Sequence, residues 1–144
     1  MKHLMIMLAV AVMFSTTAQA DDKPIAFEKL PVASQQFLNT NFPDVKILSV
    51  MQDDDLVRPD YYVRLADGIK IDFSHCGALE KIECRKGGVP ESLIPVQITG
   101  YVKSHYPDTV VVEYEVGKKG YEVKLSNHLE LKFNEGFHLL KIDD

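Results

Sequence analysis

An internal repeat is the feature that most constrains how this chain can fold. Residues 61–82 recur at residues 121–142, an offset of 60 positions, with identical residues at alternate positions such as Tyr61 and Tyr121, or Val63 and Val123. Alternate residues of a strand share one face of a sheet. The repeat therefore predicts that one strand-rich unit occurs twice in the chain.

A helix is predicted before each copy of this block, here at an offset of 64 positions. Each helix lies between two prolines, Pro31 and Pro43 in the first copy and Pro95 and Pro107 in the second. Proline is tolerated in the first helical turn, whereas a later proline pushes the residue before it out of the helical region. Apolar residues at helical spacing give each helix one stripe that can face a sheet.

Four antiparallel strands are expected after each helix. The loop Ala66-Asp67-Gly68 makes Leu65 and Ile69 cross-strand neighbours and puts Gly68 at a left-handed position, which the second copy fills with His128. The predicted fold class is α+β, a tandem duplication of a helix followed by a four-stranded antiparallel meander, with the helices packed on one face of the sheet.

The first 20 residues have the pattern of a secretory signal peptide. Lys2 precedes an apolar run, and small residues end the segment at Ala18-Gln19-Ala20. We expect cleavage near Ala20 and a periplasmic or secreted mature chain that is not inserted into the membrane. The expected domains are a signal peptide (1–20), a first repeat (21–85), a linker (86–90) and a second repeat (91–144).

The composition and motifs argue against two classes of protein. The formal net charge is −5, and because nucleic-acid-binding surfaces are normally basic we expect no nucleic-acid partner. Neighbouring nucleophile and base candidates occur at Ser74-His75-Cys76 and Ser104-His105, but adjacent side chains of an extended chain point apart. No nucleophile-elbow or zinc-protease motif is present. The sequence predicts a protein without catalytic activity.

Two cysteines flank the predicted fourth strand of the first copy. A straight strand would hold Cys76 and Cys84 further apart than the ~7 Å Cα separation that a disulfide allows. We therefore expect two unpaired thiols. A disulfide is the alternative, and it would require the strand to be strongly bent.

An acidic loop is the candidate cation site, with the four carboxylates Asp53, Asp54, Asp55 and Asp60. Clustered carboxylates on a loop attract calcium. Counted from Asp53, however, the sixth position is Arg58 and the twelfth is Arg64, where the helix-loop-helix calcium motif needs glycine and glutamate. A solvated acidic loop is the favoured interpretation and weak calcium binding the alternative; we expect no other cofactor.

The open face of the predicted sheet is the candidate ligand-binding surface, formed by Tyr62, Arg64, Lys70, Leu79 and Leu139. The two leucines reach this face unless a bulge intervenes before the fourth strand. Arg64 is placed opposite Lys70, a repulsive pair that an acidic or extended partner would compensate. The alternative is compensation within the fold by Asp72 or Glu80.

The chain resembles the exported PepSY-like proteins of Bacteroidetes, also described as β-lactamase-inhibitor-like. The resemblance covers nearly the whole predicted mature chain and is carried by the segments Phe42-Pro43-Asp44, Tyr106-Pro107-Asp108, residues 121–127 and Leu139-Leu140-Lys141-Ile142. It implies a tandem α plus antiparallel β fold and a periplasmic, non-catalytic role that is mostly unassigned. His128 departs from the family pattern, which has glycine in this turn.

The function expected from these features is that of a non-enzymatic periplasmic binding or inhibitory module. Its ligand would be a protein, a peptide or another component of the cell envelope. The inhibitor-like description concerns the fold and carries neither a β-lactamase target nor a binding residue onto this chain. The alternative is a calcium-responsive periplasmic structural protein that uses the loop from Asp53 to Asp60.

Overall fold

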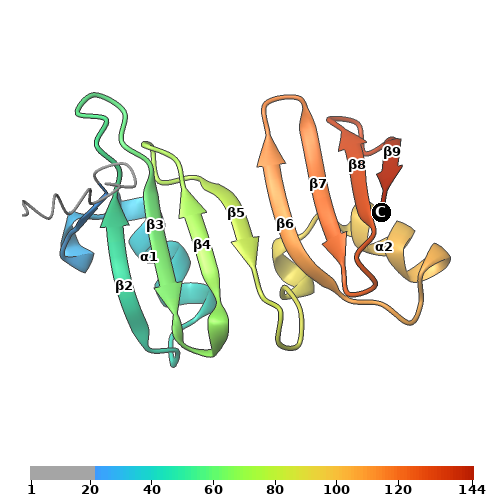
Figure 1. Ribbon diagram of the computed structural model, residues 1–144, viewed down its shortest axis with the longest axis horizontal. Coiled ribbons are helices and arrows are strands. Elements are labelled where there is room, and N and C mark those ends of the chain that lie inside the picture. The colour runs from blue at the N-terminus through green and yellow to red at the C-terminus, as the bar shows by residue number, and fades with distance from the viewer. Residues whose placement is uncertain (1–21) are drawn as a thin grey trace, which may run out of the picture.

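The computed structural model describes residues 22–144, so the predicted signal peptide lies outside the described residues. These residues form one antiparallel sheet of nine strands in sequential order, with two short α-helices (Figure 1). The helices are α1 (Val32–Asn41) and α2 (Val96–His105). The strands are β1 (Lys23–Pro24), β2 (Ile47–Gln52), β3 (Tyr61–Leu65), β4 (Lys70–Phe73), β5 (Leu79–Glu83), β6 (Val111–Gly117), β7 (Gly120–Leu125), β8 (Glu130–Asn134) and β9 (Leu139–Asp143).

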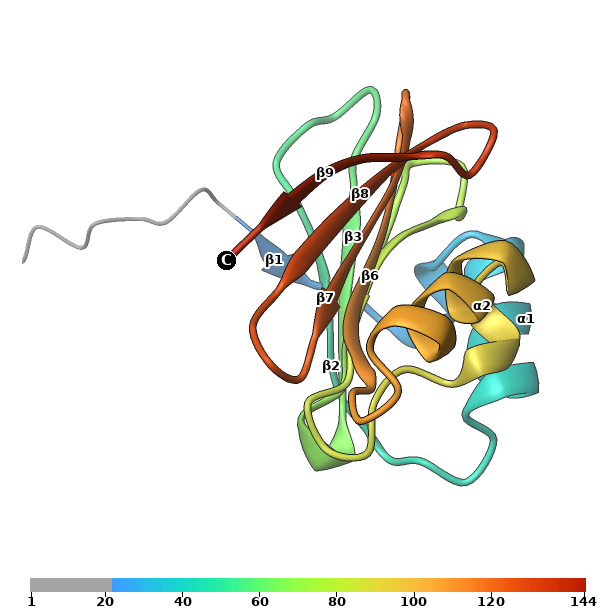
Figure 2. The same ribbon diagram turned by 90° about the vertical axis from the view of Figure 1, so that its right-hand side faces the viewer.

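Both helices lie on the same face of the sheet, and the opposite face is left open (Figure 2). The core lies between the helices and the sheet, where Phe73, Ile82, Leu125 and Leu131 are among the largest fully buried side chains. No helix among residues 22–144 is long and apolar enough to cross a membrane.

The predicted fold class is wrong, because the strands form one open nine-stranded sheet and not a four-stranded meander in each copy. Strand β5 pairs with β6 across the linker, with Lys81 opposite Glu115 and Ile82 opposite Tyr114. This pairing leaves Ile82 with 0% exposure. A unit of about 60 residues buries only a modest share of its surface, and an edge strand leaves backbone groups unpaired. Pairing of β5 with β6, called the seam between the two halves below, buries more surface and gives the backbone groups of both strands hydrogen-bond partners. The antiparallel direction of the strands agrees with the prediction.

Each helix begins directly after its proline, at Val32 and Val96, and packs one aromatic side chain against the sheet. The ring of Phe37 meets Phe73 edge to face at a centroid distance of 5.5 Å, and Tyr101 meets Phe133 in the same way at 5.6 Å. Edge-to-face contacts at these distances are favourable aromatic geometries. The two helices thus dock on their strands in equivalent ways.

The turn before β5 touches α1 at a position where only glycine fits. Gly77 has φ +84°, and a Cβ atom there would lie 2.7 Å from the Cβ of Pro31. The hydroxyl of Ser34 donates a hydrogen bond to the Gly77 carbonyl at 3.1 Å. The second copy differs, because Phe137 takes the corresponding turn with φ 63° and stacks on Tyr121 at 5.1 Å.

The predicted loop between β3 and β4 is confirmed. The Leu65 amide donates to the Ile69 carbonyl at 2.9 Å, and Gly68 adopts φ 73°. His128 adopts φ 72° in the equivalent loop, the left-handed conformation expected of it. The register that follows from this loop, with Val63 opposite Ile71, is also present.

Candidate functional site

Side chains on the open face form two rows that run across the sheet from β2 to β9. In each row, every residue is the cross-strand partner of the next. The first row is Ser49, Arg64, Lys70, Glu83, Glu113, Lys124, Glu130 and Asp143; the second is Met51, Tyr62, Asp72, Lys81, Glu115, Glu122, Lys132 and Lys141. Direct cross-strand neighbours lie about 5 Å apart, so charges in one row interact with each other. Charges also interact between the rows, as in the ion pair of Lys81 with Glu113 at 3.8 Å.

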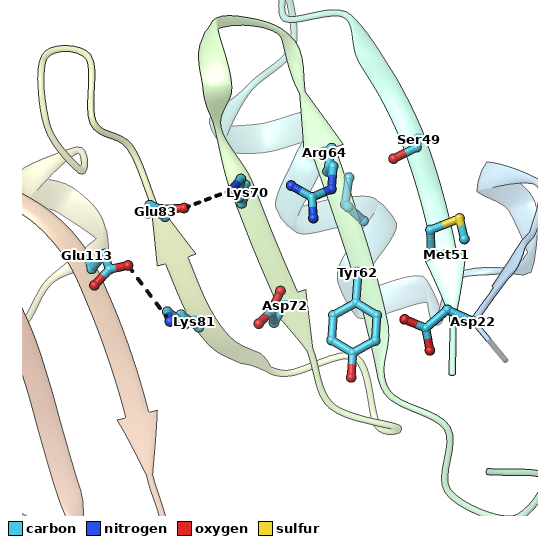
Figure 3. A pocket seen from close by; sticks show the side chains of 11 residues that line it. Asp22, Ser49, Met51, Tyr62, Arg64, Lys70, Asp72, Lys81, Glu83 and Glu113 are labelled. Atoms are coloured by element: carbon cyan, nitrogen blue, oxygen red, sulfur yellow. Dashed lines mark ion pairs between the residues drawn. The ribbon is translucent and has the colours of Figure 1, made fainter. Parts of the chain in front are cut away.

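A groove of about 660 Å³ lies over the first part of these rows (Figure 3). Its walls come from the N-terminal segment and from strands β2 to β6, and its lining residues are Asp22, Ser49, Met51, Tyr62, Val63, Arg64, Lys70, Asp72, Lys81, Glu83 and Glu113. Glu83 on β5 and Glu113 on β6 stand opposite each other across the seam between the two halves. The groove therefore depends on the joining of the halves into one sheet.

Three of the five predicted surface residues, Tyr62, Arg64 and Lys70, line this groove together. The placement of Leu79 and Leu139 on the open face is wrong. The register shifts by one residue opposite Phe73 and again opposite Phe133. These two bulges turn both leucines toward the helices, where they pack against the core.

Lys70, one member of the like-charged pair with Arg64, has an ion-pair partner that the sequence did not point to. The ammonium of Lys70 lies 3.6 Å from the carboxylate of Glu83, not beside Asp72 or Glu80. Arg64 is exposed and forms no ion pair within 4.0 Å among residues 22–144. Figure 3 shows Arg64 on β3 between Lys70 and Ser49.

In the second half of the sheet, the equivalent cation has a carboxylate partner. Lys124 occupies the position of Arg64 and lies 4.0 Å from Glu130, the residue opposite it. The two halves share a backbone pattern but differ in charge here. An arginine that faces the groove with no carboxylate within 4.0 Å among residues 22–144 is a property of the first half.

Glu83 is the buried charge of the site, with 8% of its surface exposed. Its carboxylate accepts a hydrogen bond from Arg85 Nε at 2.7 Å. Burial alone would raise the pKa of Glu83, but the hydrogen bond from Arg85 and the positive charges of Arg85 and Lys70 oppose it, and the pKa lies below its ordinary value. Glu113 in turn lies 3.8 Å from Lys81. Each of the two glutamates at the seam therefore has a cation within 4.0 Å.

Tyr62 and Asp72 stand side by side in the second row. Burial raises the pKa of Tyr62, and the carboxylates of Asp53 and Asp60 raise it further. Burial also raises the pKa of Asp72, although the positive charges of Lys81 and Arg64 oppose this effect. Tyr62 thus keeps its proton at neutral pH, so it can offer a hydrogen-bond donor and an aromatic surface to a ligand.

Two carboxylates of the acidic loop, those of Asp53 and Asp55, accept hydrogen bonds from backbone amides of the loop itself. Asp55 accepts hydrogen bonds from the amides of Val57 at 2.9 Å and Arg58 at 3.1 Å, and these two bonds lower the pKa of Asp55. Asp53 accepts a bond from the Asp55 amide at 3.1 Å. Within the described part of the chain, no three His, Cys, Asp or Glu side chains converge as a metal site. Calcium binding by this loop stays a prediction.

The cysteines are unpaired, as predicted, with Cys76 exposed and Cys84 buried. Burial raises the pKa of Cys84 to about 11, so it is a protonated, unreactive thiol. His75 and Cys76 do not point apart, because they occupy a turn; their Nε2 and Sγ atoms are 3.2 Å apart in an exposed position. The hydroxyl of Ser74 accepts a hydrogen bond from the Ala78 amide.

Sequence reasoning missed Glu83 and Glu113 as members of the site. Their strands belong to different halves, and the pairing of β5 with β6 brings them together. The available signal was the alternation of β5 and β6, in which charged residues such as Lys81, Glu83 and Glu115 face away from the apolar core residues between them.

Comparisons with known proteins give one family and a set of similar structures. Residues 59–141 match the family described as "Putative beta-lactamase-inhibitor-like, PepSY-like". A solved structure described as a "putative calcium-regulated periplasmic protein" from Bacteroides thetaiotaomicron is 40% identical, with a TM-score of 0.82; the match covers 86% of this chain and 98% of that one. No curated protein matches the chain.

Two further solved structures come from Bacteroides vulgatus. One is described as a "putative periplasmic protein" of the DUF2874 family; it is 37% identical, with a TM-score of 0.81, over 86% of this chain and 98% of that one. The other is described as a "putative periplasmic protein of unknown function"; it is 34% identical, with a TM-score of 0.80, over 85% and 99%.

Proposed function

This chain belongs to the PepSY-like, β-lactamase-inhibitor-like family, and we propose that it is a non-enzymatic periplasmic module that binds an extended segment of an envelope protein on the open face of its sheet. The signal-peptide pattern of residues 1–20 supports export. So do the three similar structures described as periplasmic proteins. The inhibitor-like description of the family favours a protein as the partner.

The observation that carries this proposal is the state of Arg64. Its neighbour Lys70 already has a carboxylate partner in Glu83, and its counterpart Lys124 has one in Glu130. Arg64 has none within 4.0 Å among the described residues, although it lines the groove. A guanidinium offers several donors in a planar fork that suits a carboxylate. A partner with an acidic side chain would complete the first row at this position.

The groove also indicates the shape of the partner. Its lining combines charged groups with the ring of Tyr62 and the side chain of Met51, which are cross-strand neighbours. An extended segment presents side chains at every second residue, the same spacing as the rows beneath it. Tyrosine and arginine are enriched where proteins bind other proteins. An extended acidic peptide is therefore the partner class that fits best.

The test is a binding titration with a labelled peptide of alternating valine and glutamate, followed by fluorescence anisotropy. Changing Arg64→Gln should raise Kd about five-fold, which corresponds to the ~1 kcal/mol upper range for an exposed ion pair. The effect should grow at low salt, where charges are less screened. Protein stability should stay unchanged, because Arg64 forms no ion pair within the described fold.

The matched control is Lys124→Gln, which removes the equivalent cation of the second half and should leave Kd unchanged. A peptide of alternating valine and lysine should bind far more weakly than the glutamate peptide. Equal binding of the two peptides, or an unchanged Kd for Arg64→Gln, would remove the basis of the proposal.

A second candidate is a calcium-regulated protein, because one similar structure carries that description. The acidic loop from Asp53 to Asp60 is the candidate site in this chain. A ligand at a hundredfold excess over its Kd stabilises the folded state by about 2.7 kcal/mol. Thermal unfolding with millimolar calcium should then show a raised Tm that Asp55→Asn reduces and Asp108→Asn, in a different exposed turn, does not. A Tm that calcium leaves unchanged would exclude this candidate.

A further inference from the structure

Strand β9 lies at one edge of the sheet and repeats the strand that joins the two halves. Its sequence Leu139-Leu140-Lys141-Ile142-Asp143 follows Leu79-Glu80-Lys81-Ile82-Glu83 of β5 at the offset of 60. The outer edge of β5 is covered by β6, whereas no strand among residues 22–144 covers the outer edge of β9. Ile82 is accordingly 0% exposed and Ile142 45% exposed.

The other edge of the sheet is partly covered. Strand β1 covers β2, with Pro24 opposite Met51. Proline has no backbone N–H to donate, and short edge strands with proline resist further pairing. Among residues 22–144, β9 is thus the strand whose outer edge is uncovered over its whole length, whereas only the start of β2, from Ile47 to Ser49, has no outer strand partner.

The backbone of β9 faces outward at the residues that pairing needs. On β5, Cys84 donates its amide to the Val112 carbonyl of β6 at 2.8 Å. In an antiparallel strand, residues two apart direct their backbone groups to the same side, so Ile82 also faces β6. By the repeat, Ile142 directs its N–H and C=O to the uncovered side of β9.

We propose that β9 pairs antiparallel with β9 of a second copy of this chain, around a two-fold axis at Ile142. In this register, Ile142 faces Ile142 of the second copy. Lys141 of each chain, which lies 3.3 Å from Asp143 of its own chain, also faces Asp143 of the other. Both pairs of opposite charge lie on the open face, where the two rows of the sheet end. The exposed isoleucines meet on the helix side and cover each other.

Charge selects this register over its neighbours. A shift of one pairing step in one direction puts Lys141 opposite Lys141 of the second copy, and a shift in the other direction puts Asp143 opposite Asp143. Like charges directly opposite each other destabilise a strand pair. The internal seam sets Lys81 opposite Glu115 and Ile82 opposite Tyr114. It also sets Glu83 opposite Glu113, a like-charged pair in which each carboxylate has a cation within 4.0 Å.

Two-fold pairing also limits the assembly to a dimer. The same edge is used by both chains, so the dimer leaves no further uncovered edge of this kind. One pair of five-residue strands buries less than the ~1,600 Å² of a standard interface. The dimer is therefore weak, and its population depends on protein concentration.

The experiment is sedimentation velocity over a range of concentrations, on protein purified after expression of the full chain, with any affinity tag at the N-terminal side. The unmodified protein should shift from the monomer to the dimer boundary as concentration rises. Lys141→Glu and Asp143→Lys should each weaken the dimer about ten-fold or more, because each replaces two attractive cross-strand pairs by two repulsive ones.

A mixture of the two variants gives the sharpest readout. In the mixed pair, the new carboxylate at position 141 of one chain faces the new lysine at position 143 of the other, and the unchanged Asp143 faces the unchanged Lys141. Two variants that fail to dimerise alone should therefore form a heterodimer together. Lys118→Glu, an exposed charge reversal in the β6–β7 turn, is the matched control and should dimerise like the unmodified protein.

Three outcomes would overturn the proposal. A protein that stays monomeric at all concentrations would show that β9 does not pair with β9 of a second copy. A dimer that neither charge reversal weakens would use another surface. Variants that are monomeric alone and stay monomeric when mixed would exclude this register.

Discussion

A buried carboxylate marks the junction of the two halves. Glu83 is 8% exposed and interacts with Arg85 at 2.7 Å and with Lys70 at 3.6 Å. These cations keep the carboxylate ionised despite its burial, and its pKa is lowered from the ordinary 4.5. Loss of this charge would leave Lys70 and Arg85 without their partner.

We expect Glu83→Gln to lower the free energy of unfolding by about 1 kcal/mol at pH 7, since the partner cations are largely solvated and a fully buried pair would cost more. A carboxylate with a lowered pKa stabilises the fold above its unfolded pKa, and this contribution is lost as pH falls through the folded pKa. The deficit of Glu83→Gln should thus shrink as pH falls below 4.5.

Urea unfolding between pH 3 and pH 7 measures this deficit. Glu130→Gln is the matched control, because its partner Lys124 is 4.0 Å away and its side chain is 38% exposed; it should cost only a few tenths of a kcal/mol. A deficit for Glu83→Gln that is constant over this range would show that its charge does not stabilise the seam.

Sequence reasoning succeeded at residues where local geometry decides the conformation. A three-residue loop requires a left-handed residue, and the pattern placed Gly68 and His128 there. It did not find Phe137, which also has a positive φ although an ordinary side chain resists that conformation. Stacking on Tyr121, a contact between segments distant in sequence, accompanies this conformation.

At the scale of elements, the prolines and the alternation identified both helices and their order with the strands. The bulges opposite Phe73 and Phe133 could not be positioned, because one extra residue in a strand leaves the apolar pattern readable in two registers. Leu79 and Leu139 were assigned to the wrong face for this reason. Strand β1 has two residues and ends in proline, too little pattern for a prediction.

The seam between β5 and β6 escaped prediction for a different physical reason. Because of the repeat, the sequence of each half predicts a complete structural unit, and the glycines and proline of residues 86–90 indicate a boundary between two units. Whether two edges then pair depends on unsatisfied backbone groups and on exposed apolar side chains such as Ile82, which no local pattern records. The division into two repeats stays a prediction, and the sheet is continuous across it.

At the scale of the whole molecule, one continuous sheet gives a helix-covered face and an open face with two rows of polar side chains. The register of β3 and β4 was enough to predict that Tyr62, Arg64 and Lys70 lie together. The acidic side of the groove was not predictable, because Glu83 and Glu113 meet only at the seam. The carboxylate that pairs with Lys70, that of Glu83, belongs to that seam.

The central claim is that the open face of the first half binds an extended acidic segment. The most direct measurement is a two-dimensional ¹H–¹⁵N NMR titration of the protein with the valine–glutamate peptide. We expect amide shifts at Ser49, Tyr62, Arg64 and Lys70 that are strongly reduced in Arg64→Gln. Shifts centred on α1, α2 or the second half of the sheet, or shifts that persist in Arg64→Gln, would contradict this account.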